Sequence, residues 1–310
     1  MTQEATAQVF STRMVVLDPD NPGEDAQINS AIEARQILRA DFDQPQPWNV
    51  LEDVSSTAEF IDFAGGTGAF GTFDNPYPNG INDESLDDFL VQVTAFLQIP
   101  EGTYFIGLNS DDGGYISMPR VTFTNTVNEN GPTGVPGELF FNGTRGQGTF
   151  TYGEFTVPPG GVRTEFEAVM FERGGGDAFE VAVLDDEFPI ESNDDWASFA
   201  IELGVEDTFD WELIEDGPGE GDFNWDDEVN FEDFLVMAAN FNTGASFAQG
   251  DFNGDGSVDL TDFGGFFPLL SAPAAAESVP EPNGISLFAL GLVTILSARR
   301  RSSLRRRRNG

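Results

Sequence analysis

Apolar and polar residues alternate along most of the segment from Phe60 to Leu213, and glycine, proline, asparagine and aspartate interrupt the pattern at short intervals. The alternation is clearest in Val91–Leu97, Tyr104–Leu108, Phe166–Met170 and Phe179–Val183. Many short strands separated by turns are typical of an antiparallel sandwich. We therefore expect a mainly β fold, with a β-sandwich at 46–214 and a partly disordered or helical lead-in at 1–45. Within the lead-in, residues 28–40 are a candidate helix that caps the sandwich.

Charge is distributed very unevenly along the 310 residues. Of the 14 basic residues, all arginine, seven lie between Arg299 and Arg308, whereas all 54 acidic residues precede them. Proteins bind nucleic acid largely through lysine and arginine, so an acidic body predicts no nucleic-acid partner. The chain also lacks histidine and cysteine, which excludes Ser-His and Cys-His nucleophiles, histidine zinc sites and disulfides. Metal ions bound by acidic loops are an alternative means of stabilising such a chain.

The C-terminal tail has three parts. After a linker at 272–278, Pro280, Glu281 and Pro282 precede an uncharged, mostly apolar run at 283–298, and the arginine cluster follows. As a helix the run would be about 24 Å long, which is shorter than the hydrocarbon core of roughly 30 Å. Snorkelling arginines can cover the difference and hold that end in the cytoplasm. The pattern therefore predicts a C-terminal transmembrane helix.

This tail resembles the PEP-CTERM sorting signal of Gram-negative envelope proteins, in which an exosortase recognises a Pro-Glu-Pro motif. The resemblance covers residues 279–310. It implies an exosortase-type partner and a location in the cell envelope or on the extracellular surface of a Gram-negative bacterium, with membrane anchoring that is at least transient. The family usually has an N-terminal secretion signal, and Met1–Asp20 lacks a basic region followed by an apolar one. We expect such a signal to precede residue 1 in the natural protein.

Two acidic segments form an internal repeat after a linker at 215–221: Asp222–Asp233 is DFNWDDEVNFED, and Asp251–Asp262 is DFNGDGSVDLTD. Oxygen atoms at positions 1, 3, 5, 7, 9 and 12 suit calcium, with position 7 supplying its carbonyl. The expected ligands are Asp222, Asn224, Asp226, Glu228, Asn230 and Asp233 in the first loop, and Asp251, Asn253, Asp255, Ser257, Asp259 and Asp262 in the second. At position 6 the second loop has Gly256, whereas the first has Asp227, which is less suited to left-handed backbone. We therefore expect the first site to be the weaker.

Each loop is followed by a helical pattern, at 231–241 and at 260–270, and neither is preceded by one. Two glycines and Pro268 weaken the second pattern. A loop with only an exiting helix, repeated in tandem, resembles the type I dockerin, which binds a cohesin partner. The resemblance covers 222–271. It implies that loop positions 10 and 11 contact the partner; these are Phe231, Glu232, Leu260 and Thr261. The alternative is a calcium-stapled module that binds no cohesin.

The segment Ile99–Met118 has the pattern of a strand, a turn containing Asp111 and Asp112, and a second strand. Together with Val169–Val183 it resembles the protective-antigen-type β-sandwich of flocculin-like adhesins, over about residues 45–210. The resemblance implies that the two aspartates hold a calcium ion that in turn binds sugar hydroxyls. Alternatively, Asp-Asp-Gly is only a favourable turn. Five aromatic residues are candidates for stacking on sugar rings, although positions in the core or on strand surfaces are the stronger expectation: Trp48, Tyr77, Tyr115, Tyr152 and Trp196.

These observations predict an exported, surface-anchored calcium-binding protein without catalytic residues. Its sandwich would bind carbohydrate or extracellular matrix, and its repeat would bind a partner. Two alternatives remain. A glycoside hydrolase needs only two carboxylates, and dockerins commonly serve polysaccharide-degrading enzymes, but the expected modules leave no room for a separate catalytic domain. A purely structural envelope component would show calcium-dependent order and no ligand.

Overall fold

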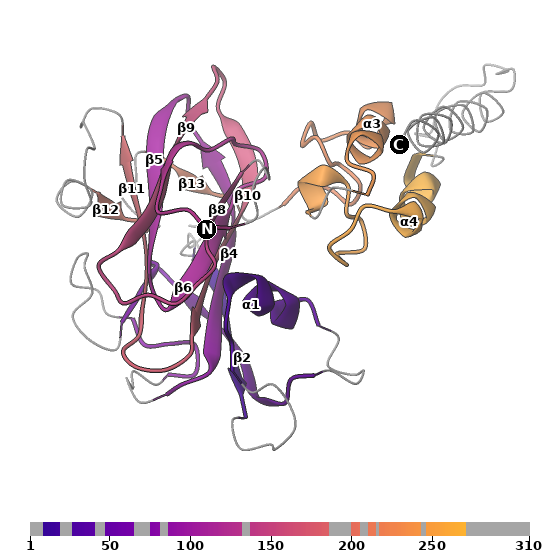
Figure 1. Ribbon diagram of the computed structural model, residues 1–310. Helices are drawn as coiled ribbons and strands as arrows, with labels where there is room; N and C mark the ends of the chain where they lie inside the picture. The colour runs from indigo at the N-terminus through magenta and orange to yellow at the C-terminus, as the bar shows by residue number, and fades with distance from the viewer. Residues whose placement is uncertain are drawn as a thin grey trace, which may run out of the picture. The chain divides into compact units, whose positions relative to one another are not determined.

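The computed structural model describes residues 9–18, 27–40, 47–64, 75–80, 86–131, 137–185, 200–204, 210–214, 217–242 and 246–270. This part of the chain is mainly β, with two antiparallel sheets that form a sandwich and three α-helices (Figure 1). Met1–Leu270 form one compact unit. The expectation of a β-sandwich is confirmed.

The first sheet contains seven strands. Its order is β2 (Val50–Ala58), β1 (Phe10–Leu17), β4 (Phe89–Ile99), β10 (Val162–Glu172), β6 (Gly113–Ser117) and β8 (Glu138–Phe141), and β13 (Glu212–Leu213) also pairs with β4. On β4, the side chains of Val91, Val93 and Leu97 are buried in the core, as the alternating pattern predicts. Gln92 and Thr94 lie between them and are only half-buried.

The second sheet contains six strands. Its order is β12 (Ile201–Glu202), β11 (Ala178–Asp185), β5 (Gly102–Asp111), β9 (Phe150–Val157) and β7 (Thr124–Val127), and β3 (Asp62–Ala64) also pairs with β11. Ile106 and Leu108 of β5 and Val181 of β11 face the same core as the first sheet. Packing of the two inner faces therefore holds the sandwich together.

The N-terminal boundary that we predicted at residue 46 is too late. β1 lies inside the first sheet, where it pairs with β2 on one side and with β4 on the other. Its residues Phe10 and Met14 are fully buried in the core. The sandwich therefore includes part of the segment that we expected to be only a lead-in.

The predicted helix at 28–40 is present as α1 (Ala31–Leu38). Ser30 caps its N-terminus, since the Ser30 side chain accepts a hydrogen bond from the Glu33 amide. The buried face of α1 packs against Tyr115, Phe140 and other apolar residues on the outer face of the first sheet. This helix therefore covers the sandwich, which was one of the two outcomes we expected for the segment.

Three short helices follow the sandwich: α3 (Phe231–Ala239), the 3-10 helix η1 (Phe247–Gln249) and α4 (Leu260–Leu270). α4 continues through Pro268, so the expected disruption of the second helix does not occur. An added Cβ at Gly265 would lie 2.6 Å from the Phe252 ring, which gives this glycine a packing role. Phe234 and Phe263 form an edge contact between α3 and α4.

Within the parts of the chain that the structure describes, no helix has the length and apolar character needed to cross a membrane. The predicted transmembrane segment 283–298 and the sorting motif Pro280–Pro282 lie outside the described residues. Both remain predictions.

Candidate functional site

Asp111 and Asp112 lie where the chain passes from one sheet to the other. Asp111 ends β5 in the second sheet, and Gly113 begins β6 in the first. The predicted order of strand, turn and strand is therefore present, but the two strands belong to different sheets. Asp111 is half-buried and only 7 % of Asp112 is exposed. The peptide bond that joins them is cis.

Backbone amides hold both carboxylates in place. The Gln147 amide donates to Asp111 Oδ2 at 3.2 Å, and the Arg173 amide donates to Asp112 Oδ2 at 2.9 Å. The Asp112 amide in turn donates to the Phe171 carbonyl at 2.9 Å. A second backbone hydrogen bond, from Arg145, also acts on Asp112 and lowers the pKa of its carboxyl group.

Two further acidic residues, Glu172 and Asp177, flank the glycine-rich segment between β10 and β11. Glu172 is 1 % exposed and Asp177 is 4 % exposed. The Tyr77 hydroxyl donates to Asp177 at 3.0 Å, and the Gly174 amide donates to Glu172 Oε1. The other oxygen of Glu172, Oε2, is buried without a hydrogen bond among the described residues.

The pKa values show that these four acids repel one another. Burial, together with the charges of Asp112 and Asp111, raises the pKa of Glu172 to about 9. Burial also raises the pKa of Asp111 to about 6, although the Gln147 amide opposes this shift and the charges of Asp112 and Asp177 add to it. The pKa of Asp112 is raised by burial. A divalent cation would relieve this repulsion, because it favours the ionised form of each carboxyl group.

Arg145 is a basic side chain beside this group, and its charge acts on Asp111. Its guanidinium donates to the carbonyls of Leu108 and Ser110, each at 3.1 Å, and to the hydroxyls of Ser110 and Thr151. It also lies over the Phe141 ring, 4.3 Å from the centroid. Burial lowers the pKa of Arg145 to about 10, and the charge of Asp111 opposes that shift. Arg145 therefore fixes the backbone that leads into the aspartate pair.

The aromatic residues considered as sugar-stacking platforms are mostly in the core. Tyr77, Tyr115 and Tyr152 are 3 %, 0 % and 3 % exposed, and Trp48 is partly buried against the α1 side of the sandwich. Trp196 lies outside the described residues. The expectation that these rings are structural is confirmed for the three tyrosines.

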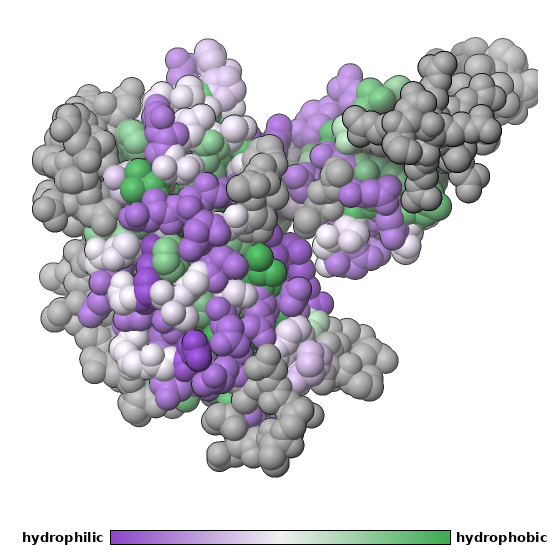
Figure 2. Space-filling view, in the orientation of Figure 1, coloured by the Kyte–Doolittle hydropathy of each residue, from purple (hydrophilic) through white to green (hydrophobic). Residues whose placement is uncertain are grey.

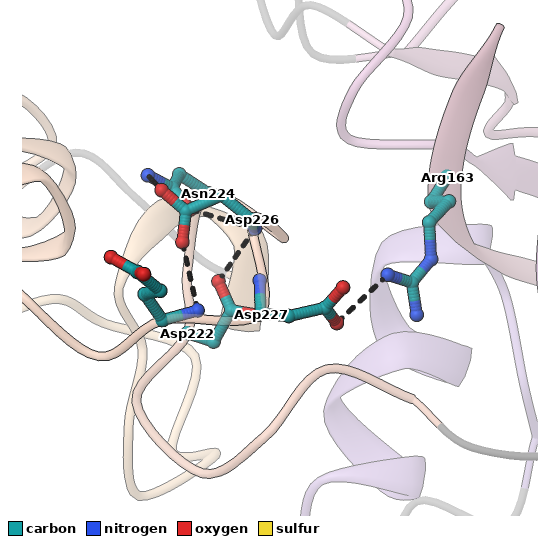
Figure 3. Close-up of polar contacts among 6 residues, drawn as sticks. Arg163, Asp222, Asn224, Asp226 and Asp227 are labelled. Atoms are coloured by element: carbon teal, nitrogen blue, oxygen red, sulfur yellow. Dashed lines mark hydrogen bonds and ion pairs between the residues drawn. The ribbon is translucent and has the colours of Figure 1, made fainter.

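The two acidic loops share six internal hydrogen bonds at matching positions, and in the second loop the Gly254 amide also donates to Asp251 at 2.9 Å. In the first loop the amides of Asp226 and Asp227 donate to Asp222, and the Asp226 amide also donates to Asn224 (Figure 3). The Glu228 amide donates to Asp226, and the amides of Asn224 and Asn230 donate to Asp233. In the second loop the amides of Asp255 and Gly256 donate to Asp251, and the Asp255 amide also donates to Asn253. The Ser257 amide donates to Asp255, and the amides of Asn253 and Asp259 donate to Asp262. The sequence repeat is therefore also a structural repeat.

Backbone conformation agrees with the reasoning about position 6. Gly256 has φ 84° and Asp227 has φ 66°, so both loops turn through left-handed backbone at this position. Position 4 is also left-handed in each loop, with Gly254 at φ 74° and Trp225 at φ 61°. The first loop therefore bears the cost of two non-glycine residues in this conformation.

Carboxylates at the ends of both loops are buried. Asp222, Asp233, Asp251 and Asp262 are each at most 3 % exposed. Burial raises the pKa values of Asp233 and Asp251, whereas backbone amides that donate to them act in the opposite direction. Among the described residues, no group of three or more acidic side chains is arranged to hold a metal ion. The twelve calcium ligands therefore stay a prediction, and cation binding would require the carboxylates to reorient.

The four residues expected to contact a cohesin are all exposed, and these are Phe231, Glu232, Leu260 and Thr261. Phe231 is 46 % exposed and Leu260 is 64 % exposed. Leu235 on α3 and Phe267 on α4 are also exposed, at 50 % and 36 %. Outside the grey residues, Figure 2 shows a mostly hydrophilic face with scattered hydrophobic residues, in keeping with the acidic composition.

Sequence reasoning missed Glu172, Asp177 and Arg145. Glu172 and Asp177 flank three glycines in the quoted segment Val169–Val183. That spacing was the available signal, because acidic residues on both sides of a flexible turn can converge. Arg145 has no comparable signal, because the backbone carbonyls that it holds, those of Leu108 and Ser110, are more than 30 positions away.

No family model matches this chain, and no curated protein matches it. Among solved structures, it is similar to a PA14 sugar-binding domain from an RTX adhesin, at 16% identity and a TM-score of 0.42, over 65% of this chain and 97% of that one. It is also similar to the PA14 domain of the antifreeze protein MpAFP, at 13% identity and a TM-score of 0.38, over 66% and 93%. A third is the A domain of Epithelial Adhesin 9 from Candida glabrata in complex with Galb1-4GlcNAc, at 11% identity and a TM-score of 0.35, over 68% and 92%. These likenesses are distant.

Proposed function

We propose that this chain is an exported, surface-anchored protein whose sandwich binds carbohydrate or extracellular matrix through a calcium ion held by Asp111 and Asp112. The observation that carries the proposal is the group of acids at one end of the sandwich. A buried oxygen of Glu172 there has no hydrogen bond among the described residues, and burial with neighbouring charge raises the pKa of Glu172 to about 9. Calcium binds carboxylate oxygens and accepts six to eight ligands. Among the described residues no three acids are arranged to hold a metal ion, so calcium binding here, as in the loops, would require the carboxylates to reorient.

Each residue of the site has a defined part in this proposal. Asp111 and Asp112 would hold the ion, and the amides of Gln147 and Arg173 keep their carboxylates oriented. The bound ion would supply positive charge and open coordination positions for vicinal hydroxyls. Arg145 supports the backbone before Asp111 through the Ser110 carbonyl.

Residues 222–310 support two further parts of the proposal, which are calcium binding by the acidic loops and anchoring at the cell surface. The repeated hydrogen bonds of the two loops and the exposure of Phe231 and Leu260 support a dockerin-like module that binds calcium and a cohesin-type partner. Pro280, Glu281 and Pro282, followed by the apolar run and the arginines, support sorting by an exosortase-type enzyme in a Gram-negative envelope. A module that binds calcium without a cohesin remains the alternative.

The test is binding of the full chain to a glycan array in millimolar calcium and then in chelator. Asp112→Asn keeps the side-chain volume and one acceptor oxygen but removes the charge, so calcium-dependent binding should be lost. Glu101→Gln is the matched control, because Glu101 is an exposed acid in the loop between β4 and β5. Binding that persists equally in chelator or in Asp112→Asn would refute the proposed site. No binding in either condition would favour a purely structural component.

One observation favours a second function. A carboxyl group that stays protonated at neutral pH beside ionised carboxylates is the arrangement of a glycosidase general acid, and Glu172 has these properties. A hydrolase would release reducing sugar from polysaccharide, and Glu172→Gln would abolish that release. A binding protein would release none.

A further inference from the structure

The two acidic loops differ where their backbones are left-handed. Position 4 is Trp225 in the first loop and Gly254 in the second, and position 6 is Asp227 and Gly256. The two loops share the six internal hydrogen bonds described above, and they differ at position 4, where the Gly254 amide also donates to Asp251. Because non-glycine residues are disfavoured in left-handed backbone, contacts of Trp225 and Asp227 outside the loop must offset their cost.

Trp225 makes such contacts with the sandwich. Its side chain is only 5 % exposed, and its ring meets the Phe96 ring of β4 edge-on, with the centroids 5.6 Å apart. Two guanidinium groups lie over the same ring, Arg163 of β10 at 5.6 Å and Arg120 at 5.9 Å from the centroid. An aromatic ring attracts cations over its face, so Trp225 brings together two arginines that would otherwise repel each other.

Asp227 adds a directional contact. Its carboxylate forms an ion pair with Arg163 at 3.1 Å (Figure 3). The Asp227 side chain is 78 % exposed, and exposed ion pairs contribute little to stability. The ion pair between Asp227 and Arg163 therefore orients the loop, whereas burial of the Trp225 ring supplies most of the attachment to the sandwich.

Charge complementarity points to the same surface. Residues 1–298 contain only seven arginines, and two of them meet the first acidic loop. Burial and the charge of Arg163 lower the pKa of Arg120, and Asp222 of the first loop opposes that shift. The second loop lies beside a third arginine, since an added Cβ at Gly256 would be 2.9 Å from Arg39 Nη1.

We propose that Phe96, Arg120 and Arg163 form a receptor surface on the outer face of the first sheet. Its ligand is the first acidic loop of the same chain, with Trp225 as the anchor. The surface fits an acidic loop that presents one aromatic ring, and it fixes the helical module in one orientation on the sandwich. The second loop has glycines in place of both docking residues. This docking is separate from carbohydrate binding at Asp111 and Asp112, and either can be present without the other.

The absence of native cysteine allows the orientation to be measured directly, because spin labels attach only to introduced cysteines. In the full chain, Glu101→Cys on the sandwich and Ala239→Cys at the end of α3 are both exposed positions. Pulsed electron paramagnetic resonance should give a single narrow distance distribution. Trp225→Gly with Asp227→Gly gives the first loop the glycines of the second, so the loop should stay folded while the distribution becomes several-fold wider.

Two further variants make the test specific. Arg163→Gln removes the ion pair from the sandwich side, and it should also widen the distribution. Leu235→Ser changes an exposed residue of α3 and should leave the distribution narrow. Circular dichroism of each variant checks that the helices remain. A broad distribution in the parent chain, an unchanged one in the double-glycine variant, or equal broadening by Leu235→Ser would overturn the proposal.

Discussion

Replacing Glu172 with glutamine should stabilise the folded chain at neutral pH. In the folded state, burial and the charges of Asp112 and Asp111 raise the pKa of Glu172 from 4.5 to about 9. Folding at pH 7 therefore requires the carboxyl group to take up a proton that it has lost in the unfolded chain. Because the folded pKa is raised, the stability contributed by this group is complete below pH 4.5 and is lost as pH rises toward 9.

The size of the effect follows from the shift. One pKa unit corresponds to about 1.4 kcal/mol, so raising the pH from 4.5 to 7 should cost the wild-type chain about 3 kcal/mol at this residue. Glutamine does not ionise, and its side-chain oxygen can still accept from the Gly174 amide as Glu172 Oε1 does. Glu172→Gln should therefore match wild type near pH 4.5 and exceed it by about 3 kcal/mol at pH 7.

Urea denaturation from pH 4.5 to 8.5, with chelator present, measures this difference. The matched control is Glu167→Gln, which removes the same charge from β10 where Glu167 accepts a hydrogen bond from Gln92 at 2.7 Å. That variant should lose stability with pH in parallel with wild type. If Glu172→Gln also follows the wild-type slope, or is less stable at pH 7, the reasoning about the acidic group is wrong. Excess calcium should narrow the gap, because a cation favours the ionised form of Glu172.

Two further predictions concern the helical module. Calcium at a hundredfold excess over its dissociation constant should stabilise the folded chain by about 2.7 kcal/mol per independent site. In thermal melts, Asp262→Asn should remove the part of this calcium-dependent stabilisation that the second loop contributes. An equal calcium response in wild type and Asp262→Asn would exclude that loop as a site. On α4, an added Cβ at Gly264 would have no atom within 4 Å, so Gly264→Ala should raise the free energy of unfolding by about 0.5–1 kcal/mol, because alanine favours helix. Gly265→Ala should lower the melting temperature, because its Cβ would lie 2.6 Å from the Phe252 ring; equal gains from both would contradict this packing.

The strands and the loop repeat could be predicted from sequence because their signals are local. Alternation in Val91–Leu97 places successive side chains on opposite faces whatever strand lies alongside. The acidic loops likewise carry their structure within twelve residues, since their backbone amides bond to side chains of the same loop. The chemistry of Asp222–Asp233 and Asp251–Asp262 could therefore be compared position by position before the fold was known.

Strand order and the surroundings of Asp111 and Asp112 required the tertiary structure. β1 joins the first sheet through pairing with residues 33 or more positions away, and no local pattern specifies such a neighbour. The aspartate pair has the sequence of a tight turn, yet it connects two sheets because β6 pairs with β10 instead of β5. Glu172 is about 60 residues from Asp112 in sequence, yet the same strand pairing brings it close enough for the charge of Asp112 to raise its pKa. Sequence alone identified the acids of the two loops, whereas only long-range strand pairing determined which acids share the end of the sandwich.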